Sequence, residues 1–437
     1  MEEKPILGEG RLDELKKTAH FALLVGTYKS GKEKQSCEEH LDELERLGET
    51  YGLLEMEKMP TPLREISAST YLGKGKIQEL SELCKEKKID LVVFDDDISP
   101  QQQRNLEKIF EKPVIDRTEL ILGVFEQRAK TKEAKIQIDL ARFHYQLPRL
   151  KRMWTHLSRQ RVGGKSGGYL KGAGERQIEI DRQLLKDKIS KLEKELKQVR
   201  KQRHVQRTAR LRSNIPTFAI VGYTNAGKST LLKALTQADV LVEDKLFATL
   251  DTTTRKFTLP NKQEILLIDT VGFIRKIPHT LVAAFKSTLE ETLFTDILLH
   301  LIDVSSEAAE EQAEASMQVL KELKAEDKPT ITVLNKIDAV SDRKVANKLK
   351  LQYGKAVFVS ALKKEGFDDL LNIMMKEISR LRKLVHLKVP QAHYDIVARL
   401  MKEAKVISCD YEENDVLIEA EIPQNLEKLV KPFMLDK

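Results

Sequence analysis

An eight-residue stretch constrains the fold of this chain more than any other feature. An apolar run at residues 217–221 comes before it and predicts a buried strand, and the apolar spacing of residues 230–235 predicts a helix behind it. The stretch fits the phosphate-binding pattern G-x-x-x-x-G-K-[ST] at every fixed position and consists of Gly222, Tyr223, Thr224, Asn225, Ala226, Gly227, Lys228 and Ser229. Strand, glycine loop and helix together predict a nucleotide-binding α/β domain.

The residue types of this loop predict its chemistry. Glycines allow successive backbone N–H groups to surround phosphate oxygens, and the N-terminus of the following helix adds partial positive charge. We expect Lys228 to reach the outer phosphates in a catalytic role, and the Ser229 hydroxyl to ligate Mg²⁺. The alternative is an ordinary strand-to-helix turn.

Composition limits the class of protein. A chain of 437 residues is too long for one hydrophobic core. No apolar run approaches the ~20 residues that span a bilayer, and the N-terminal residues lack the features of a signal peptide. Three scattered cysteines, Cys37, Cys84 and Cys409, form neither a disulfide framework nor a metal cluster. We expect a cytoplasmic monomer, with peripheral membrane association as an alternative location and no stable membrane insertion.

The order of apolar patterns predicts four domains. Residues 1–118 alternate strand-like and helix-like segments, which predicts a small α/β domain with a parallel sheet. Residues 119–212 form a helical hairpin with a glycine-rich tip, and residues 213–384 form the nucleotide domain with a mostly parallel sheet wrapped by helices. Residues 385–437 make a small α/β tail domain. The fold class is therefore α/β.

The hairpin is strongly basic. Helical patterns at about 120–147 and 175–211 flank a glycine-dense stretch at residues 163–174. Residues 149–212 carry 20 Lys and Arg against 6 Asp and Glu, although the whole chain has a net charge of only +7. Such a segment is either a solvated coiled-coil hairpin or a probe into structured RNA, in which Trp154 and Tyr169 stack on bases. The local charge favours RNA.

Two later motifs predict guanine as the base. The first follows an apolar strand and consists of Asn335, Lys336, Ile337 and Asp338. The Asp338 carboxylate can accept hydrogen bonds from N1–H and the 2-amino group of guanine, and adenine has no such donor pair. The second motif also ends a strand and offers backbone N–H groups to guanine O6; its residues are Ser360, Ala361 and Leu362.

Two further segments predict a nucleotide-dependent switch. One ends a strand and consists of Asp269, Thr270, Val271 and Gly272; Asp269 holds Mg²⁺ through water, and the Gly272 N–H contacts the γ-phosphate in a catalytic role. The other lies in a threonine-rich loop and consists of Phe247, Ala248, Thr249, Leu250 and Asp251. We assign Thr249 to catalysis and, with Ser229, to Mg²⁺. Thr252, Thr253 and Thr254 remain alternatives on sequence logic alone.

Together these motifs resemble the HflX family of translation-factor-related GTPases. The resemblance is carried by residues 222–229, 247–251 and 269–274, by Tyr71-Leu-Gly-Lys-Gly-Lys76, and by the glycine-rich run before Glu175-Arg-Gln177. It implies a GTPase of the stress response that binds GTP and GDP, the large ribosomal subunit and ribosomal RNA. It also implies splitting or rescue of stalled ribosomes, with the tip at residues 163–174 directed towards the peptidyl transferase centre, and it supports Thr249 as the Mg²⁺ ligand.

Two residues bear on the rate of hydrolysis. Phe273 stands where Ras-like enzymes carry the glutamine that orients the attacking water, so slow intrinsic hydrolysis with stimulation by the ribosome is expected. Asn225 occupies the position of a K⁺-binding asparagine in potassium-stimulated GTPases. K⁺ near the phosphates would do part of the electrostatic work of an arginine finger. A hydrogen bond within its own loop is the alternative for Asn225.

Two other functions are alternatives to a ribosome-bound switch. A GTP-dependent, RNA-binding ribosome assembly factor would use the same basic hairpin. A metabolic P-loop kinase is disfavoured by residues 335–338, which select guanine, and by the absence of a recognisable pocket for an acceptor substrate.

Overall fold

The computed structural model describes residues 20–150, 170–212, 215–236, 246–250, 252–276, 293–340, 342–412 and 414–435. They divide into two compact units. The first unit contains the described residues up to 200 together with residues 246–250 and 271–276, and the second contains the remaining described residues. Both segments predicted to switch thus have residues that belong to the first unit.

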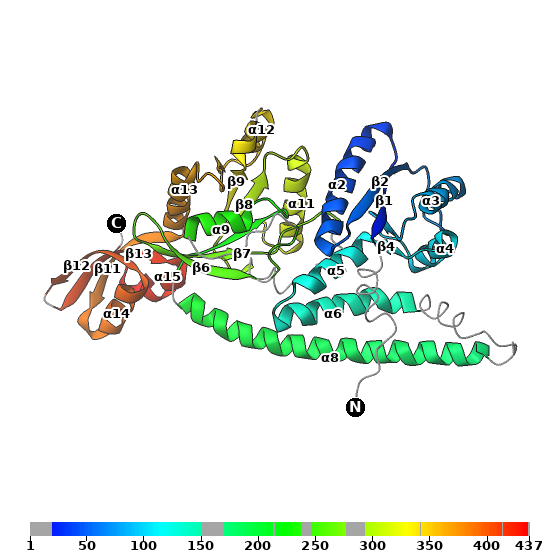
Figure 1. The fold of residues 1–437 in the computed structure, drawn as a ribbon. Helices are drawn as coiled ribbons and strands as arrows, with labels where there is room; N and C mark the ends of the chain where they lie inside the picture. Colours follow the sequence, from blue (N-terminus) through cyan, green and yellow to red (C-terminus); the bar gives the residue numbers. More distant parts are fainter. Residues whose placement is uncertain are drawn as a thin grey trace. The chain divides into compact units, whose positions relative to one another are not determined.

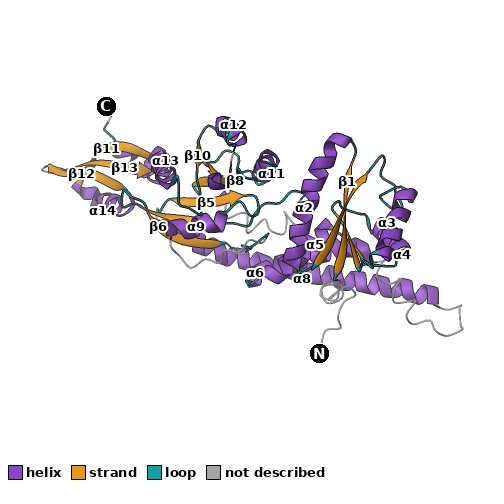
Figure 2. Cartoon of the chain, turned by 45° about the horizontal axis from the view of Figure 1, so that its top comes forward, coloured by secondary structure: helices purple, strands orange, loops and turns teal. Residues whose placement is uncertain are grey.

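The first unit contains a four-stranded parallel sheet in the order β2-β1-β3-β4. Its strands are β1 (Phe21–Tyr28), β2 (Glu55–Pro62), β3 (Leu91–Phe94) and β4 (Val114–Asp116). Helices cover both faces: α2 (Lys34–Tyr51) and α5 (Arg117–Arg128) one face, α3 (Lys74–Glu86) and α4 (Pro100–Phe110) the other (Figures 1 and 2). The predicted parallel α/β domain is confirmed.

The hairpin is built from α6 (Lys132–Gln146), a 3₁₀ turn (Leu147–Arg149) and α8 (Leu170–Arg212). The continuous helix expected over residues 120–147 is wrong. Ala129 is extended, and Thr131 caps α6 by accepting a hydrogen bond from the Ala134 N–H at 3.2 Å. Apolar side chains join α6 to α8, among them Ile136, Leu140, Phe143, Leu185, Ile189 and Leu196.

The tip of the hairpin is only partly described. Trp154, Tyr169 and residues 163–168 lie outside the described residues. Residues 170–174, predicted as loop, form the first turn of α8, which begins five residues before the expected start at Glu175. Helix formation therefore continues through Gly172 and Gly174, although glycine is a poor helix former.

The second unit contains a six-stranded sheet in the order β10-β9-β8-β5-β7-β6. Only the β6–β7 pair is antiparallel, which confirms the mostly parallel sheet. The strands are β5 (Thr217–Gly222), β6 (Thr253–Thr258), β7 (Glu264–Asp269), β8 (Ile297–Asp303), β9 (Thr330–Asn335) and β10 (Ala356–Phe358).

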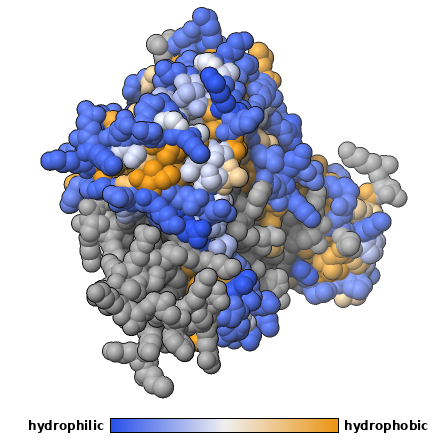
Figure 3. All heavy atoms as spheres, turned by 90° about the vertical axis from the view of Figure 1, so that its right-hand side faces the viewer, coloured by the Kyte–Doolittle hydropathy of each residue, from blue (hydrophilic) through white to orange (hydrophobic). Residues whose placement is uncertain are grey.

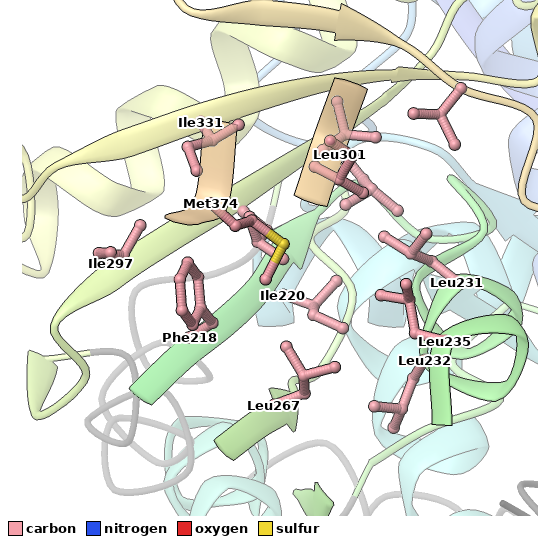
Figure 4. Packing of buried hydrophobic residues seen from close by; sticks show 14 of the residues in the cluster. Phe218, Ile220, Leu231, Leu232, Leu235, Leu267, Ile297, Leu301, Ile331 and Met374 are labelled. Atoms are coloured by element: carbon pink, nitrogen blue, oxygen red, sulfur yellow. The ribbon is translucent and has the colours of Figure 1, made fainter. Parts of the chain in front are cut away.

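Helices enclose this sheet and bury its core. They are α9 (Lys228–Thr236), α11 (Ala309–Glu322), α12 (Lys344–Gln352) and α13 (Phe367–Arg380). Figure 4 shows Leu231, Leu232 and Leu235 of α9 in the core that contains the strand residues Ile220 and Leu267. This core fixes the loop between β5 and α9, because it anchors the elements on both sides of the loop.

The C-terminal part is a small antiparallel sheet with helices, which agrees with the predicted α/β tail. Its strands are β11 (Arg382–Pro390), β12 (Lys405–Glu412) and β13 (Asp415–Pro423) in the order β11-β13-β12, and its helices are α14 (Tyr394–Glu403) and α15 (Gln424–Val430). The face of the molecule in Figure 3 is mostly hydrophilic, with apolar side chains in small groups. Among the described helices, none is both long and apolar enough to cross a bilayer.

Candidate nucleotide-binding site

The predicted phosphate-binding loop links β5 to α9, the strand and helix expected on either side of it. Gly222 and Gly227 have φ angles of 145° and 93°, a region that favours glycine. A side chain would also clash at both positions, with the Leu301 carbonyl at Gly222 and with the Asn335 side chain at Gly227. Both glycines are therefore required by backbone conformation and by close packing.

Lys228 is a buried cation at the start of α9. Its Nζ donates hydrogen bonds to the carbonyl oxygens of Gly222 and Tyr223, at 3.2 and 2.7 Å. Burial, opposed by the charge of Asp269, lowers the pKa of Lys228 to about 8. Neutral carbonyls stabilise an ammonium group less than an anion does, so this environment suits a negatively charged ligand.

Hard oxygen ligands lie beside the loop. The Ser229 hydroxyl donates a hydrogen bond to Asp269 Oδ2 at 2.7 Å, and Asp269 is fully buried at the end of β7. The next residue, Thr270, is fixed by a 2.7 Å hydrogen bond from its hydroxyl to the Ile220 carbonyl. A hydroxyl and a carboxylate next to a phosphate-binding loop fit Mg²⁺, which prefers oxygen ligands and is usually shared with substrate phosphates.

Asn335 joins three of the predicted motifs. Its Nδ2 donates to the Ala226 carbonyl at 2.8 Å, and its Oδ1 accepts a hydrogen bond from the Ala361 N–H at 3.0 Å. Residues 222–229, 335–338 and 360–362 are thereby brought together at one edge of the sheet. Asp338 lies in a 3₁₀ turn (Ile337–Ala339) and is partly exposed, whereas the Leu362 side chain is 78% exposed.

Part of each predicted switch segment is described within the first unit. Phe247, with a φ of 55°, packs its ring edge-on against Phe125 of α5, with centroids 4.5 Å apart. Ala248 and Thr249 are half-buried and Leu250 is buried, whereas Asp251 lies outside the described residues. The other segment buries Val271, Gly272, Phe273, Ile274 and Arg275.

An ion-pair cluster begins three residues after the second switch segment. It consists of Glu43, Asp95, Asp96, Arg117, Arg275 and Lys276, and Glu43 pairs with both Arg117 and Arg275. Asp95 accepts hydrogen bonds from Arg117 at 2.7 Å, from Arg275 at 3.1 Å and from Lys276 at 3.0 Å. Lys276 also pairs with Asp96 at 2.5 Å. Burial alone would raise the pKa of Asp95, but the three cations lower it to about 2.

Sequence reasoning missed this cluster and the Phe125 contact. A signal was present, because Asp95, Asp96 and Asp97 directly follow the apolar strand β3. Acidic residues at the carboxyl end of a parallel strand lie where such sheets place polar sites. Their basic partners could not be found in this way, since Arg275 is 180 residues further along the chain.

Comparisons with known proteins place the chain in a family. It is 48% identical to GTPase HflX of Chlamydia pneumoniae over 414 residues, which cover 94% of this chain and 88% of that protein. The chain belongs to the HflX family. GTPase HflX of Akkermansia muciniphila is 44% identical over 425 residues, which cover 95% of this chain and 97% of that HflX protein.

Three family models and a solved structure also match this chain. The models are described as GTP-binding GTPase N-terminal (residues 38–126), GTP-binding GTPase middle region (128–210) and 50S ribosome-binding GTPase (217–336). The structure is a GTP-binding protein of the archaeon Sulfolobus solfataricus with GDP. It is 25% identical, covers 83% of this chain and 99% of its own, and has a TM-score of 0.43.

Membership of the HflX family confirms the sequence-based prediction of a GTPase. The chain is a GTP-hydrolysing enzyme of a family described as 50S ribosome-binding. The resemblance that rested on residues 222–229, 247–251 and 269–274 is confirmed at the level of the family.

Proposed function

We propose that this HflX-family GTPase is a switch on the large ribosomal subunit. It binds the subunit in the GTP form, splits or rescues stalled ribosomes, and leaves after hydrolysis that the ribosome stimulates. The observation that carries the nucleotide part is the Asn335 side chain, whose two hydrogen bonds join the phosphate-binding loop to the strand end that carries residues 360–362.

The predicted site residues that contact phosphate, Mg²⁺ or the base have the following roles in this proposal. Lys228 and the N–H groups of residues 222–229 bind the phosphates, and the Gly272 N–H contacts the γ-phosphate. Ser229 and Thr249 would hold Mg²⁺ directly, with Asp269 acting through water. When bound, Mg²⁺ neutralises the charge that develops on the phosphate oxygens. Asp338 and the N–H groups of residues 360–362 recognise guanine.

The environment of Phe273 supports a slow intrinsic reaction. Its side chain is only 1% exposed and has no donor or acceptor, so it cannot orient the attacking water. A group other than the residue at this position must then orient the attacking water. The ribosome is the partner that can supply or order it. K⁺ at Asn225 is a second source of positive charge, and equal rates in KCl and NaCl would exclude it.

The basic hairpin supports ribosomal RNA as the partner surface. Residues 149–212 have a larger positive net charge than the whole chain, and neutralising phosphates releases counterions in proportion to the number of contacts. Binding through this hairpin should therefore weaken steeply as salt rises.

Single-turnover GTP hydrolysis with and without large ribosomal subunits tests the proposal. We expect the subunits to raise the rate by at least about tenfold, and deletion of residues 163–174 to remove ribosome rescue while GTP binding persists. The matched control exchanges exposed Lys348 of α12 for Ala, outside the hairpin. Rapid hydrolysis without any partner would contradict the proposal, and action only on immature subunits would favour the assembly factor.

A further inference from the structure

Lys336, the second residue of the Asn335–Asp338 motif, has an ion-pair partner on a neighbouring strand. Its Nζ lies 2.7 Å from Oδ2 of Asp303, the last residue of β8. Asp303 and Asn335 are partners in the parallel pairing of β8 with β9, so both residues lie at the same edge of the sheet, where the two strands end. The relative exposures of the Lys336 and Asp303 side chains are 32% and 14%.

Asp303 is itself fixed in one orientation. Its Oδ1 accepts hydrogen bonds from the Ser305 N–H at 3.0 Å and from the Ser305 hydroxyl at 2.6 Å. These bonds leave Oδ2 directed to Lys336. The carboxylate therefore presents a rigid acceptor, and holding the lysine requires little further ordering of Asp303.

Lys336 is held in an unusual backbone conformation. Its φ and ψ are 62° and 32°, in the left-handed region that non-glycine residues rarely adopt. The turn is closed by a 3.0 Å hydrogen bond from the Ala339 N–H to the Lys336 carbonyl. Local strain of this kind persists where surrounding contacts fix it, and it is common at ligand-binding sites.

We propose that Asp303 is a positioning residue for the bound purine, acting through Lys336. With its ammonium group held by Asp303, the methylene chain of Lys336 lies along the plane of the base, which sits between residues 335–338 and 360–362. Long cationic side chains commonly cover apolar surface with their methylenes while the charged end stays in a polar setting. This contact involves the ring plane and not the 2-amino group, so it strengthens binding of GTP, GDP and inosine nucleotides alike.

An ordinary surface pair in the same domain provides the comparison. Lys348 and Glu310 also lie 2.6 Å apart, but their side chains are 65% and 40% exposed and neither belongs to a predicted nucleotide motif. Glu310→Gln therefore removes an ion pair of similar length without reaching the site. Only the Asp303 pair should change nucleotide binding.

Stopped-flow dissociation of a fluorescent GDP analogue tests the proposal, which rests on the proposed GTP site. We expect Asp303→Asn to speed dissociation of guanosine and inosine diphosphates by roughly three- to tenfold, with the rate of hydrolysis at saturating GTP unchanged. Glu310→Gln should leave dissociation unchanged. Combining Asp303→Asn with Lys336→Met should add no further effect to Lys336→Met alone.

The failures of the two proposals are distinguishable. If the unaltered protein does not retain guanine nucleotides, the proposed site is wrong. If it retains them and Asp303→Asn leaves the dissociation rate unchanged, or still speeds it when Lys336 is Met, the positioning role is wrong. Thermal unfolding of the nucleotide-free proteins identifies a purely structural effect: a lower Tm at an unchanged dissociation rate overturns the proposal.

Discussion

The parallel sheet of the first unit and the mostly parallel sheet of the second use the same topological position in opposite ways. In an open parallel sheet, ligands bind outside the carboxyl ends of the strands, where the strand order reverses. In the first unit this point lies between β1 and β3, and in the second between β5 and β8. Asp95 and Asp96 follow β3, whereas the phosphate-binding loop follows β5.

The first position is filled by the chain itself. Arg117, Arg275 and Lys276 pair with Asp95, and the Thr27 hydroxyl at the end of β1 donates to Asp96 at 2.7 Å. At the second position, the hydrogen bonds of Lys228 Nζ go to the carbonyl oxygens of Gly222 and Tyr223, apart from the more distant charge of Asp269. One sheet edge has balanced its charges, and the other holds a cation suited to an anionic ligand.

The pKa shifts express the same difference. Asp95 has a lowered pKa, of about 2, because its cations outweigh burial and favour the charged form. Lys228 also has a lowered pKa, of about 8, but for a base this means that burial disfavours the charged form. A bound polyphosphate would reverse the shift at Lys228, whereas Asp95 is already compensated.

Replacing Asp95 should have the largest effect. Asp95→Ala leaves Arg117 and Arg275 buried with Glu43 as the carboxylate that still pairs with both, and breaking a buried ion pair costs about 3–5 kcal/mol. We expect the free energy of unfolding of the first unit to fall by that amount, measured by native-state hydrogen exchange at β3. Glu79→Gln, which breaks the exposed pair with Lys76, is the matched control and should change stability by less than about 1 kcal/mol. Equal effects of the two substitutions would mean that the cluster is not compensated as described.

Replacing Lys228 should weaken nucleotide binding without changing the fold. Lys228→Ala is expected to weaken GTP binding by about a hundredfold, because a buried charge-assisted contact to phosphate is lost. Titration with a fluorescent GTP analogue measures the change. Lys233→Ala, on the exposed face of the same helix α9, is the control and should bind as the unaltered protein does. Binding within threefold of the unaltered protein after Lys228→Ala would contradict the contrast between the two sheet edges.

The strands of the second sheet show what sequence could predict. Strands such as β5, β7 and β9 were predicted because each is a short, largely buried apolar run. The edge strand β6 was not, since Thr253–Thr258 is partly exposed and has no apolar run. Motif spacing likewise predicted the residues that Asn335 joins. The pairing of Asp303 with Lys336 could not be predicted, because an acidic residue at the end of a strand does not identify its partner, which is known only once β8 and β9 are paired.

The same kind of limit applied to the hairpin and the switch segments. The break between α5 and α6 depends on one threonine cap, and apolar periodicity continues across it. The contact of Phe247 with Phe125 joins residues more than 100 positions apart, so local pattern could not reveal it. Local interactions are therefore readable from sequence, whereas long-range polar and aromatic partners require the fold.

His300 tests whether a pKa shift caused by burial is by itself a sign of a binding site. It lies within β8 away from the carboxyl edge, is fully buried, and neither ring nitrogen has a hydrogen-bond partner in the described part of the chain. Burial lowers its pKa from 6.5 to about 4, so the unfolded chain takes up a proton at higher pH than the folded protein does. The neutral ring contributes stability above pH 6.5, and that contribution falls as the pH drops towards 4.

We expect the free energy of unfolding of the second unit to decrease by on the order of 1 kcal/mol between pH 7.5 and pH 5.5 because of this residue. His300→Leu should remove that decrease, because leucine has no titrating group, and should leave GTP binding unchanged. Denaturant titrations at the two pH values measure the effect. Unchanged GTP binding would show that a pKa lowered by burial does not by itself mark a binding site. If His300→Leu weakened GTP binding as Lys228→Ala is expected to, the position of a residue at the carboxyl edge would not be what distinguishes the site from the core.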